Sequence, residues 1–322
     1  MKLTVLSGGV GGARFTRGLL AHLAEVAHGS TVTVIANTGD DMWLHGVRVC
    51  PDLDTLMYTL GGGVHEEQGW GRRDETARVS ADLARYGVGW DWFTLGDLDL
   101  ATHLARTQFL REGLTLSQTT ARLSERWGLA EQDVRLLPMS DQPVETHVET
   151  DEGLIHFEEW WVRHRAALPA RRFVQVGLAE AQAAPGVLDA IRDADVVLLP
   201  PSNPVVSVGT ILAVPGVRDT LRTTAAPVVG VSPIIGGAPV RGMAAECLAT
   251  IGVQASAEAV ARHYGLRSGG DGVLDGWLVD TADKDTADAL MADGWRSAAT
   301  DTLMRDVPST ARIAAELLAL AD

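Results

Sequence analysis

Lysine is nearly missing from this chain of 322 residues, where it occurs only as Lys2 and Lys284. Because acidic residues outnumber Lys and Arg by 42 to 27, the formal net charge is −15. A chain this acidic is not suited to bind nucleic acid or an anionic membrane as its main partner. Any phosphate that it binds has to be held by arginine, by backbone N–H groups or by a metal ion.

Cysteines and long apolar runs are also scarce. Cys50 and Cys247 are the only cysteines, which argues against a disulfide framework or a zinc site. The apolar run after Lys2 is too short for a signal peptide, and no stretch is long enough to span a bilayer. We therefore expect a cytoplasmic protein.

What the chain does contain is an alternation of apolar strands and amphipathic helices. A short apolar run that ends in a polar or glycine-rich loop occurs in residues 2–8, 30–41, 194–204 and 226–237. This order predicts a three-layer α/β sandwich with a largely parallel sheet. The pattern of residues 66–137 is mostly helical, which predicts a helical cap or insertion within a single domain of residues 1–322.

The first predicted strand runs into the stretch LSGGVGGARF, residues 6–15. Glycines at a strand-to-helix turn let backbone N–H groups face an anion, and Arg14 adds a forked donor. A P-loop is excluded because this stretch contains no lysine, and an NAD fingerprint fails because its third glycine position holds Arg14. We predict a nucleotide-phosphate site; the alternative is a tight turn without a ligand. The residues concerned are Gly8, Gly9, Gly11, Gly12 and Arg14.

Four aspartates follow the second predicted strand. Asp40 and Asp41 come just after it, and Asp52 and Asp54 stand at a predicted helix start. Carboxylates gathered in one crevice repel each other unless a cation lies between them. Oxygen ligands beside a diphosphate suit Mg²⁺. The alternative is that one aspartate caps the helix and the others are solvated.

Two later loops also follow predicted strands. The loop PPSNPVVSVG offers Ser202, Asn203 and Pro204, and the loop VSPIIGG offers Ser232. Loops at the carboxyl ends of parallel strands form the ligand crevice of such folds. The alternative is that these residues only make turns.

Seven blocks occur in a fixed order: GGVGGARF, NTGDD, CPDLDTLMYTLGGG, DWFTLGDLDLATH, HFEEWWVRHR, PSNPVVSVG and VSPIIGG. Together they resemble the 2-phospho-L-lactate transferase family of coenzyme F420 biosynthesis, in particular its actinobacterial branch. The resemblance implies a Rossmann-like fold and a homodimer. It also implies Mg²⁺-dependent transfer of a 2-phospholactyl or enolpyruvyl-phosphate group from a guanosine diphosphate conjugate. The acceptor is the 5′-hydroxyl of the deazaflavin FO, and the products are (dehydro) coenzyme F420-0 and GMP.

The resemblance assigns roles to the four aspartates. Asp40 and Asp54 would hold Mg²⁺, and Asp41 or Asp52 would orient the attacking hydroxyl or take its proton. The glycine loop would lie against the nucleotide phosphates, while the Ser202 and Ser232 loops hold guanosine.

The flat FO ring would need an aromatic or apolar wall. Tyr58, Trp90 and Trp92 are the candidates, with Asp97 as a polar companion. Ser140 and Asp141, in SDQP, resemble a Ser-Asp loop of the family and join the predicted FO site. Trp160 and Trp161 are assigned to core packing.

Two other functions remain open from the sequence. A related family of nucleotide-sugar-binding regulators shares the glycine loop and the Ser202 loop, but it lacks the tryptophan-rich middle blocks. A dinucleotide oxidoreductase is disfavoured because the glycine stretch departs from the NAD-binding fingerprint at Arg14. Within the transferase hypothesis, the sequence does not decide between a lactyl, an enolpyruvyl and a glyceryl group, because these differ by only a few atoms.

Overall fold

A seven-stranded sheet forms the centre of the protein, whose computed structural model describes residues 1–89 and 92–322. All neighbouring strands in it are parallel. In spatial order they are β14 (Arg296–Thr300), β13 (Gly276–Asp280), β10 (Val228–Val231), β9 (Val196–Leu199), β1 (Lys2–Ser7), β2 (Thr31–Ala36) and β5 (Val134–Pro138). The chain builds outward from β1 in one direction through β2 and β5, and then in the other from β9. The switch point therefore lies between β1 and β9, where such sheets bind ligands.

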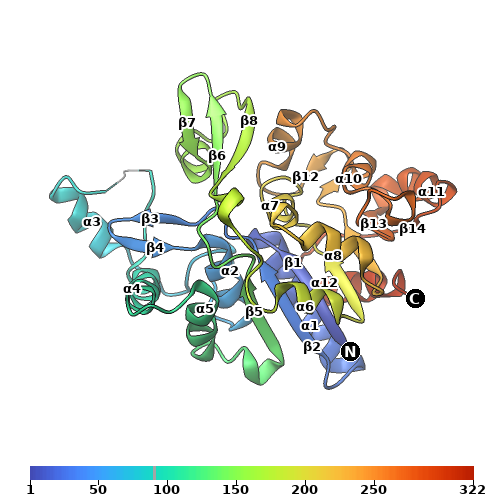
Figure 1. Ribbon diagram of the computed structural model, residues 1–322, viewed down its shortest axis with the longest axis horizontal. Helices are drawn as coiled ribbons and strands as arrows, with labels where there is room; N and C mark the ends of the chain where they lie inside the picture. Colours follow the sequence, from blue (N-terminus) through green and yellow to red (C-terminus); the bar gives the residue numbers. More distant parts are fainter. Residues whose placement is uncertain (90–91) are drawn as a thin grey trace.

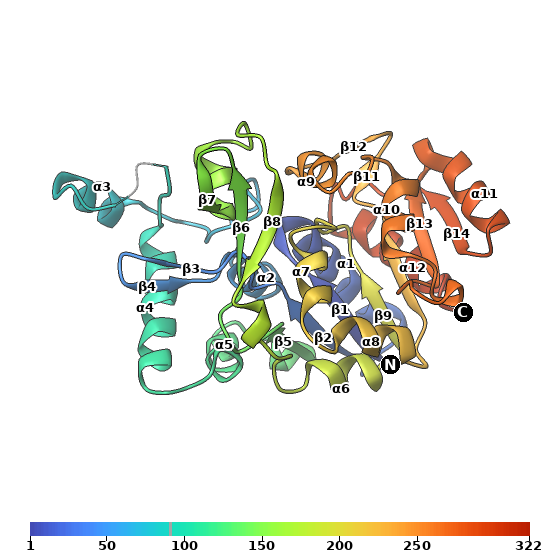
Figure 2. The same ribbon diagram turned by 45° about the horizontal axis from the view of Figure 1, so that its top comes forward.

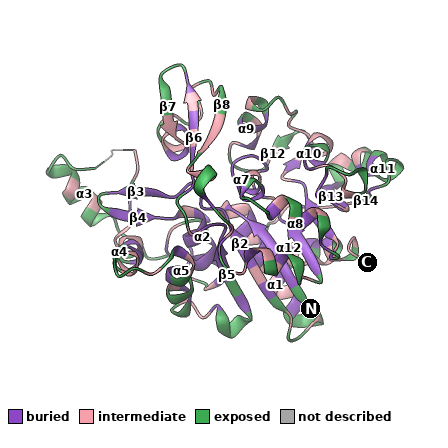
Figure 3. Cartoon of the chain, in the orientation of Figure 1, coloured by how far each residue is buried: buried purple, intermediate pink, exposed green. Residues whose placement is uncertain are grey.

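Helices cover both faces of this sheet, as the purple central strands of Figure 3 illustrate. In β9, Val196 and Leu198 join one core cluster while Val197 and Leu199 join the other. Strands buried on both faces have to be apolar throughout, which explains the continuous apolar runs of the sequence. The three-layer α/β prediction is confirmed. One face carries α1 (Gly9–Val26), α2 (Pro51–Leu60) and α12 (Val307–Ala319). The other core includes residues of α6 (Val187–Arg192), α7 (Val208–Ala213), α8 (Val217–Thr223), α9 (Ala244–Thr250), α10 (Ala257–Tyr264) and α11 (Lys284–Ala292).

The segment between α2 and β5 is mostly helical. It contains α3 (Arg78–Arg85), α4 (Asp97–Arg111), α5 (Leu116–Glu125) and the short 3-10 helix η1 (Ala130–Gln132). The hairpin β3 (Met42–Leu44) and β4 (Val47–Val49), together with α3 and α4, extends away from the sheet on the left of Figures 1 and 2. The chain rejoins the sheet at Val134, so residues 134–137 of the expected insertion belong to the edge strand β5.

A small antiparallel sheet lies beyond the carboxyl ends of the central strands, at the top of Figure 1. It consists of β6 (Glu145–Thr150), β7 (Gly153–His156) and β8 (Arg172–Val176). The pattern of LIHFEEWWVRHR is strand-like, with aromatic residues, but β7 ends at His156 and a π-helix, η2 (Glu159–Arg163), follows. Trp160 is 1% exposed and donates its indole N–H to the Leu168 carbonyl oxygen at 2.8 Å, which anchors this helical turn in the core.

The remaining elements are short. They are the hairpin β11 (Ile234–Ile235) and β12 (Ala238–Pro239), and the 3-10 helices η3 (Leu178–Glu180), η4 (Arg267–Gly269) and η5 (Thr281–Asp283). Within the described part of the chain, no helix combines the length and apolarity that crossing a membrane requires.

Candidate active site

A cleft of about 900 Å³ opens at the carboxyl ends of the central strands, around the switch point between β1 and β9. Loops that are far apart in the sequence meet in it, as the topology requires. The predicted site residues that line it are Gly8, Gly9, Gly11, Arg14, Asp40, Asp52, Asp54, Tyr58, Trp92, Ser202, Asn203 and Ser232.

Other predicted residues do not line the cleft. Those that lie outside its wall are Gly12, Asp41, Asp97, Ser140, Asp141 and Pro204. Trp90 falls outside the described residues. The Asp97 carboxylate accepts from the Val79 N–H at 3.0 Å, so it ties α3 to the start of α4. Asp141 accepts from the Ser117 N–H at 2.6 Å at the start of α5, and Ser140 is fully buried. The structure therefore does not support an FO-binding role for these three residues.

The glycine loop joins β1 to α1 with little space around it. A Cβ on Gly11 would lie 2.5 Å from the carbonyl oxygen of Pro201, so the first turn of α1 packs directly on the neighbouring loop. Ser202 holds that loop in place, because its hydroxyl donates to the Gly8 carbonyl oxygen at 2.7 Å and accepts from the Gly8 N–H at 3.2 Å. The glycines are thus needed for close backbone approach.

The helix N-terminus is only partly occupied. The Gly9 N–H donates to Asp52 Oδ1 at 2.7 Å, so a carboxylate of the protein itself takes the first donor. In the described structure, the N–H groups of Val10 and Gly11 have no hydrogen-bond partner, and both residues line the cleft. Unpaired N–H groups at the start of a helix attract phosphate.

Three carboxyl groups gather in the middle of the cleft: Asp40, Asp52 and Glu158. Each is less than 9% exposed. The Asn37 side-chain amide donates to Asp52 Oδ2 at 2.9 Å and to Asp40 Oδ2 at 3.3 Å, while Asp40 Oδ1 is buried without a partner. Burial, followed by repulsion from Asp52, raises the pKa of Glu158 to about 8 and that of Asp40 well above its usual range. Glu158 was not predicted as a site residue, because its place depends on the helical turn after β7.

A second acidic group lies where α2 faces α4. Ligand atoms of Asp54, Asp99 and His103 lie within 4.8 Å of one another, the one such group that can hold a cation among the described residues. Asp99 and His103 are one helical turn apart, and Arg106 follows on the same face and pairs with Asp54 through both guanidinium nitrogens. The prediction paired Asp54 with Asp40 instead. The signal that could have revealed the group is the stretch DLDLATHLAR, whose spacing places Asp99, His103 and Arg106 on one face of a helix.

Asp41 lies behind the cleft wall. Its carboxylate is 3.6 Å from the guanidinium of Arg48, which also bonds Glu145 of β6 at 3.1 Å. Burial raises the pKa of Asp41 to about 7, although Arg48 opposes the shift. Because Asp41 is absent from the cleft lining, the prediction that it orients the acceptor hydroxyl is not supported.

Aromatic side chains form one wall of the cleft. The wall consists of Tyr58, Trp70, Trp92, Phe93, Phe157 and Trp161. Tyr58 is fully buried, donates its hydroxyl to Asp99 Oδ1 at 2.6 Å and contacts Trp127 at a ring distance of 5.0 Å. Trp160 packs in the core as predicted, and Trp161 packs against the same core while also lining the cleft, a role that the sequence did not predict. A flat, largely apolar ring system fits such a wall.

Three arginines from separate elements also line the cleft: Arg14, Arg165 and Arg241. A Cβ on Gly69 would lie 3.2 Å from Arg241 Nη1 and 3.4 Å from Arg14 Nη2, so these two guanidinium groups face the same point. Burial and the charge of Arg241 lower the pKa of Arg14. Like charges placed together in an acidic protein favour an anionic ligand.

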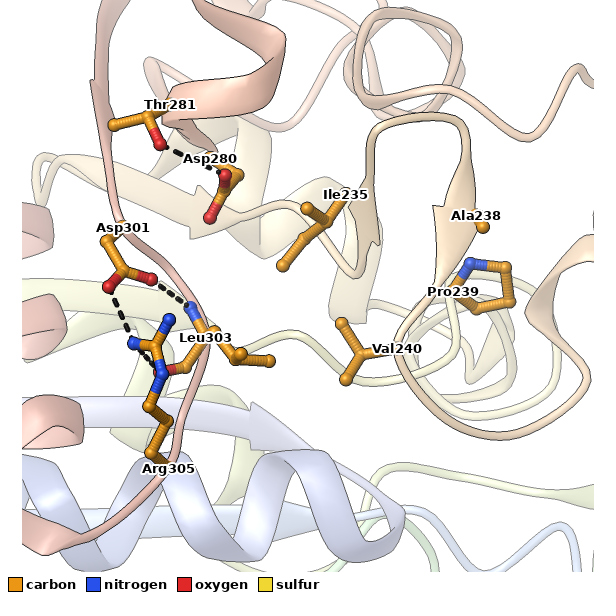
Figure 4. A pocket seen from close by; sticks show the side chains of 9 residues that line it. All are labelled: Ile235, Ala238, Pro239, Val240, Asp280, Thr281, Asp301, Leu303 and Arg305. Atoms are coloured by element: carbon orange, nitrogen blue, oxygen red, sulfur yellow. Dashed lines mark hydrogen bonds and ion pairs between the residues drawn. The ribbon is translucent and has the colours of Figure 1, made fainter.

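A second pocket of about 470 Å³ extends the cleft over the ends of β10, β13 and β14 (Figure 4). Ile235, Val240 and Leu303 line both cavities. Its carboxylates already have partners: Asp280 accepts from the Thr302 N–H at 2.8 Å, and Asp301 pairs with Arg305 at 2.6 Å. This pocket is therefore a mainly apolar extension of the cleft.

The fold and the cleft define a doubly wound α/β protein whose ligand crevice lies at the switch point of the sheet. The family model of 2-phospho-L-lactate transferase CofD matches residues 3–315. Curated phosphoenolpyruvate transferases from Kitasatospora aureofaciens and Streptomyces coelicolor are 57% and 54% identical over 326 residues, which covers 100% of this chain and 98% of each relative. A phosphoenolpyruvate transferase from Mycobacterium sp. (strain JLS) is 55% identical, over 97% of this chain and 96% of the relative's length. This chain belongs to the 2-phospho-L-lactate transferase family, and it is a transferase.

Solved structures show the same architecture at low identity. Two structures of a Bacillus halodurans protein, one of them described as a member of the UPF0052 family, match with TM-scores of 0.61 and 0.62. Each covers 98% of this chain, at 17% identity. At this identity the likeness establishes the fold alone.

Proposed function

We propose that this transferase moves an enolpyruvyl-phosphate or 2-phospholactyl group from a guanosine diphosphate conjugate to the 5′-hydroxyl of FO, giving (dehydro) coenzyme F420-0 and GMP. The observation that carries the proposal is one continuous cleft with three chemically distinct parts. Free N–H groups and arginines suit the diphosphate, buried carboxyls suit proton and metal chemistry, and the aromatic wall suits the deazaflavin. The printed names of the relatives favour the enolpyruvyl donor.

The proposed reaction depends on positioning. The acceptor hydroxyl attacks the phosphorus that carries the three-carbon group. The bond from this phosphorus to the bridging oxygen of the diphosphate breaks, and GMP leaves with that oxygen. Transfer at a diphosphate needs in-line alignment and neutralisation of charge more than covalent help from the protein. Val10 and Gly11 N–H groups would bind phosphate oxygens, and Ser202, Asn203 and Ser232 would lie along the guanosine.

A divalent cation, proposed to be Mg²⁺, fits the carboxylates of the cleft. The unpartnered Asp40 Oδ1 and the Asp54, Asp99 and His103 group are the observations that favour a cation here. We propose Asp54 and Asp40 as ligands, as the sequence predicted. Asp99 and His103 lie close to Asp54 and are further candidates, whereas Asp40 is outside that group. When bound, the cation would neutralise charge on the diphosphate. Calorimetric titration of Asp54→Asn with Mg²⁺ should show weakened binding, compared with the exposed control Asp82→Asn.

The decisive experiment is mass spectrometry of the products formed from FO with each candidate donor. We expect GMP and a single phosphodiester product, with the enolpyruvyl donor turned over fastest. Fluorescence titration with FO supplies a separate measurement of acceptor binding. A wild-type protein that binds a nucleotide sugar, but neither binds FO nor makes a product, would instead be a regulator.

The aromatic wall gives a first prediction about the acceptor. Replacing Trp161 with Ala should raise the FO dissociation constant about tenfold, because a ring stacked on an aromatic side chain contributes about 1–3 kcal/mol. GDP affinity, measured by calorimetry, should stay within about twofold. The matched control is Trp43→Ala, since Trp43 is half exposed on the β3–β4 hairpin and does not line the cleft. Unchanged FO binding by the Trp161 variant would place the acceptor elsewhere.

The proposal also includes a cytoplasmic homodimer, which rests on the resemblance to the family. Light scattering on the purified protein tests the dimer directly. A monomer at working concentrations would contradict this part of the proposal without affecting the transferase assignment.

A further inference from the structure

Glu158 differs from the other carboxylates of the cleft in having no hydrogen-bond donor. Asp52 accepts from Gly9 and Asn37, and Asp54 is paired with Arg106. Asp99 accepts from the Tyr58 hydroxyl. No donor reaches the Glu158 carboxyl from any described residue, although Glu158 is only 8% exposed and lines the cleft. Buried carboxyl groups usually accept hydrogen bonds from the protein, from ordered water or from a ligand, so a carboxyl that faces the cleft without a protein donor is available to a ligand.

The backbone around Glu158 has an unusual shape. Glu158 stands at the N-cap position of the π-helix η2 without a side-chain capping bond, and its own N–H donates to His156 Nδ1 at 3.1 Å. At the other end of the turn, Arg165 and Ala166 both have positive φ, at 50° and 55°. Both features are costly and concentrate at functional sites. Here they turn the chain so that Glu158, Trp161 and Arg165 all reach the cleft.

We propose that Glu158 is the catalytic residue that binds the attacking hydroxyl of the acceptor and receives its proton. The inference rests on the proposed function and adds a residue to it. Glu158 lies beside Phe157 of the aromatic wall, and the charged side chains that face it from other elements are Asp40 and Asp52. The hydroxyl oxygen forms the new bond to phosphorus, its proton passes to the Glu158 carboxylate, and GMP departs with the electron pair of the broken P–O bond.

The test is Glu158→Gln, which preserves the size of the side chain and removes the proton acceptor. We expect kcat to fall at least 100-fold, while the dissociation constants for FO and GDP change less than about threefold. The Glu158→Asp variant should retain more activity than Glu158→Gln because it keeps a carboxylate. Glu159→Gln is the matched control: Glu159 is the adjacent residue, its carboxylate is paired with Arg163 at 2.6 Å, and it lies outside the cleft lining.

The outcomes separate this inference from the function on which it rests. A wild-type enzyme that makes product while Glu158→Gln keeps its kcat overturns the role of Glu158 alone. Equal loss of FO binding and of thermal stability in Glu158→Gln also overturns it, because Glu158 would then be structural. A wild-type protein that makes no product from FO and any donor overturns the proposed function and this inference together.

Discussion

At the scale of single residues, the charged groups under the cleft depend on a few buried partners. Arg106 is 1% exposed, and besides Asp54 it donates to the carbonyl oxygen of Arg48 at 3.3 Å. Burial alone would lower the pKa of this guanidinium, but the charge of Asp54 more than offsets the effect, so the pKa of Arg106 is raised. Burial raises the pKa of Asp54, and Arg106 opposes that shift and fixes the carboxyl group in place at the edge of the cleft.

Removing this partner should cost much stability. We expect Arg106→Met to lower the free energy of unfolding by about 3–5 kcal/mol, because it leaves the Asp54 carboxylate buried without a counter-charge. Urea unfolding followed by circular dichroism measures the change. Arg111→Met, at the exposed end of the same helix, should change it by less than about 0.5 kcal/mol. A loss below about 1 kcal/mol in Arg106→Met would show that Asp54 is solvated or neutral.

At the scale of elements, the glycine loop at the start of α1 has a packing role in addition to its proposed role in binding an anion. The loop has to admit the backbone of Pro201 and also leave N–H groups facing the cleft. One consequence is that a side chain on Gly11 would first meet the protein and not the phosphate. A loss of nucleotide binding in such a variant would therefore report a shifted loop.

The corresponding prediction is that Gly11→Ala lowers the free energy of unfolding by about 1–3 kcal/mol, because its Cβ would meet the Pro201 carbonyl at 2.5 Å. Gly269→Ala is the control, since no atom lies within 4 Å of a Cβ built there. Denaturant titration of both variants compares them directly. If Gly11→Ala matched the control in stability but lost GDP binding, the glycine would serve the ligand alone.

At the scale of the whole molecule, the fold concentrates uncompensated carboxyl groups at one edge of the sheet. Glu158, Asp41 and Asp52 have pKa values raised to about 8, 7 and 6, in each case chiefly by burial. A group with a raised pKa binds its proton more tightly in the folded than in the unfolded state. Stability therefore increases as the pH falls through the folded-state value.

We accordingly expect the metal-free protein in EDTA to melt several degrees higher at pH 6.5 than at pH 8.5. Two groups oppose this trend at the low end of the window: burial lowers the pKa values of His156 and His263 from 6.5, so protonation near pH 6.5 favours the unfolded chain. Glu145, whose pKa is lowered to about 2, titrates well below the window. Added Mg²⁺ should reduce the difference, because a cation stabilises the ionised carboxylates at high pH. Scanning calorimetry at the two pH values, with and without Mg²⁺, measures the melting temperatures. A melting temperature that falls between pH 8.5 and pH 6.5 would mean that these carboxyls are solvated.

The sequence by itself determined the layered sheet, the glycine loop and twelve of the residues that line the cleft. Apolar runs such as residues 196–199 are local signals, because a strand covered on both faces is apolar at every position. Likewise, Gly8, Asp40 and Ser202 lie in the loops that follow β1, β2 and β9, and parallel strands bring such loops to one edge of the sheet. These features depend only on the chain near each residue and on the sheet topology.

Only the tertiary structure decided which carboxylates are paired and which are free. Asp54 meets His103 and Arg106 because side chains of α4 reach the start of α2, a contact that no local pattern specifies. Glu158 reaches the cleft because the chain leaves β7 in a π-helical turn that burial of Trp160 stabilises, whereas its sequence resembles a strand. Long-range packing decides which partner a buried charged group meets, and that partner in turn decides the role of the group.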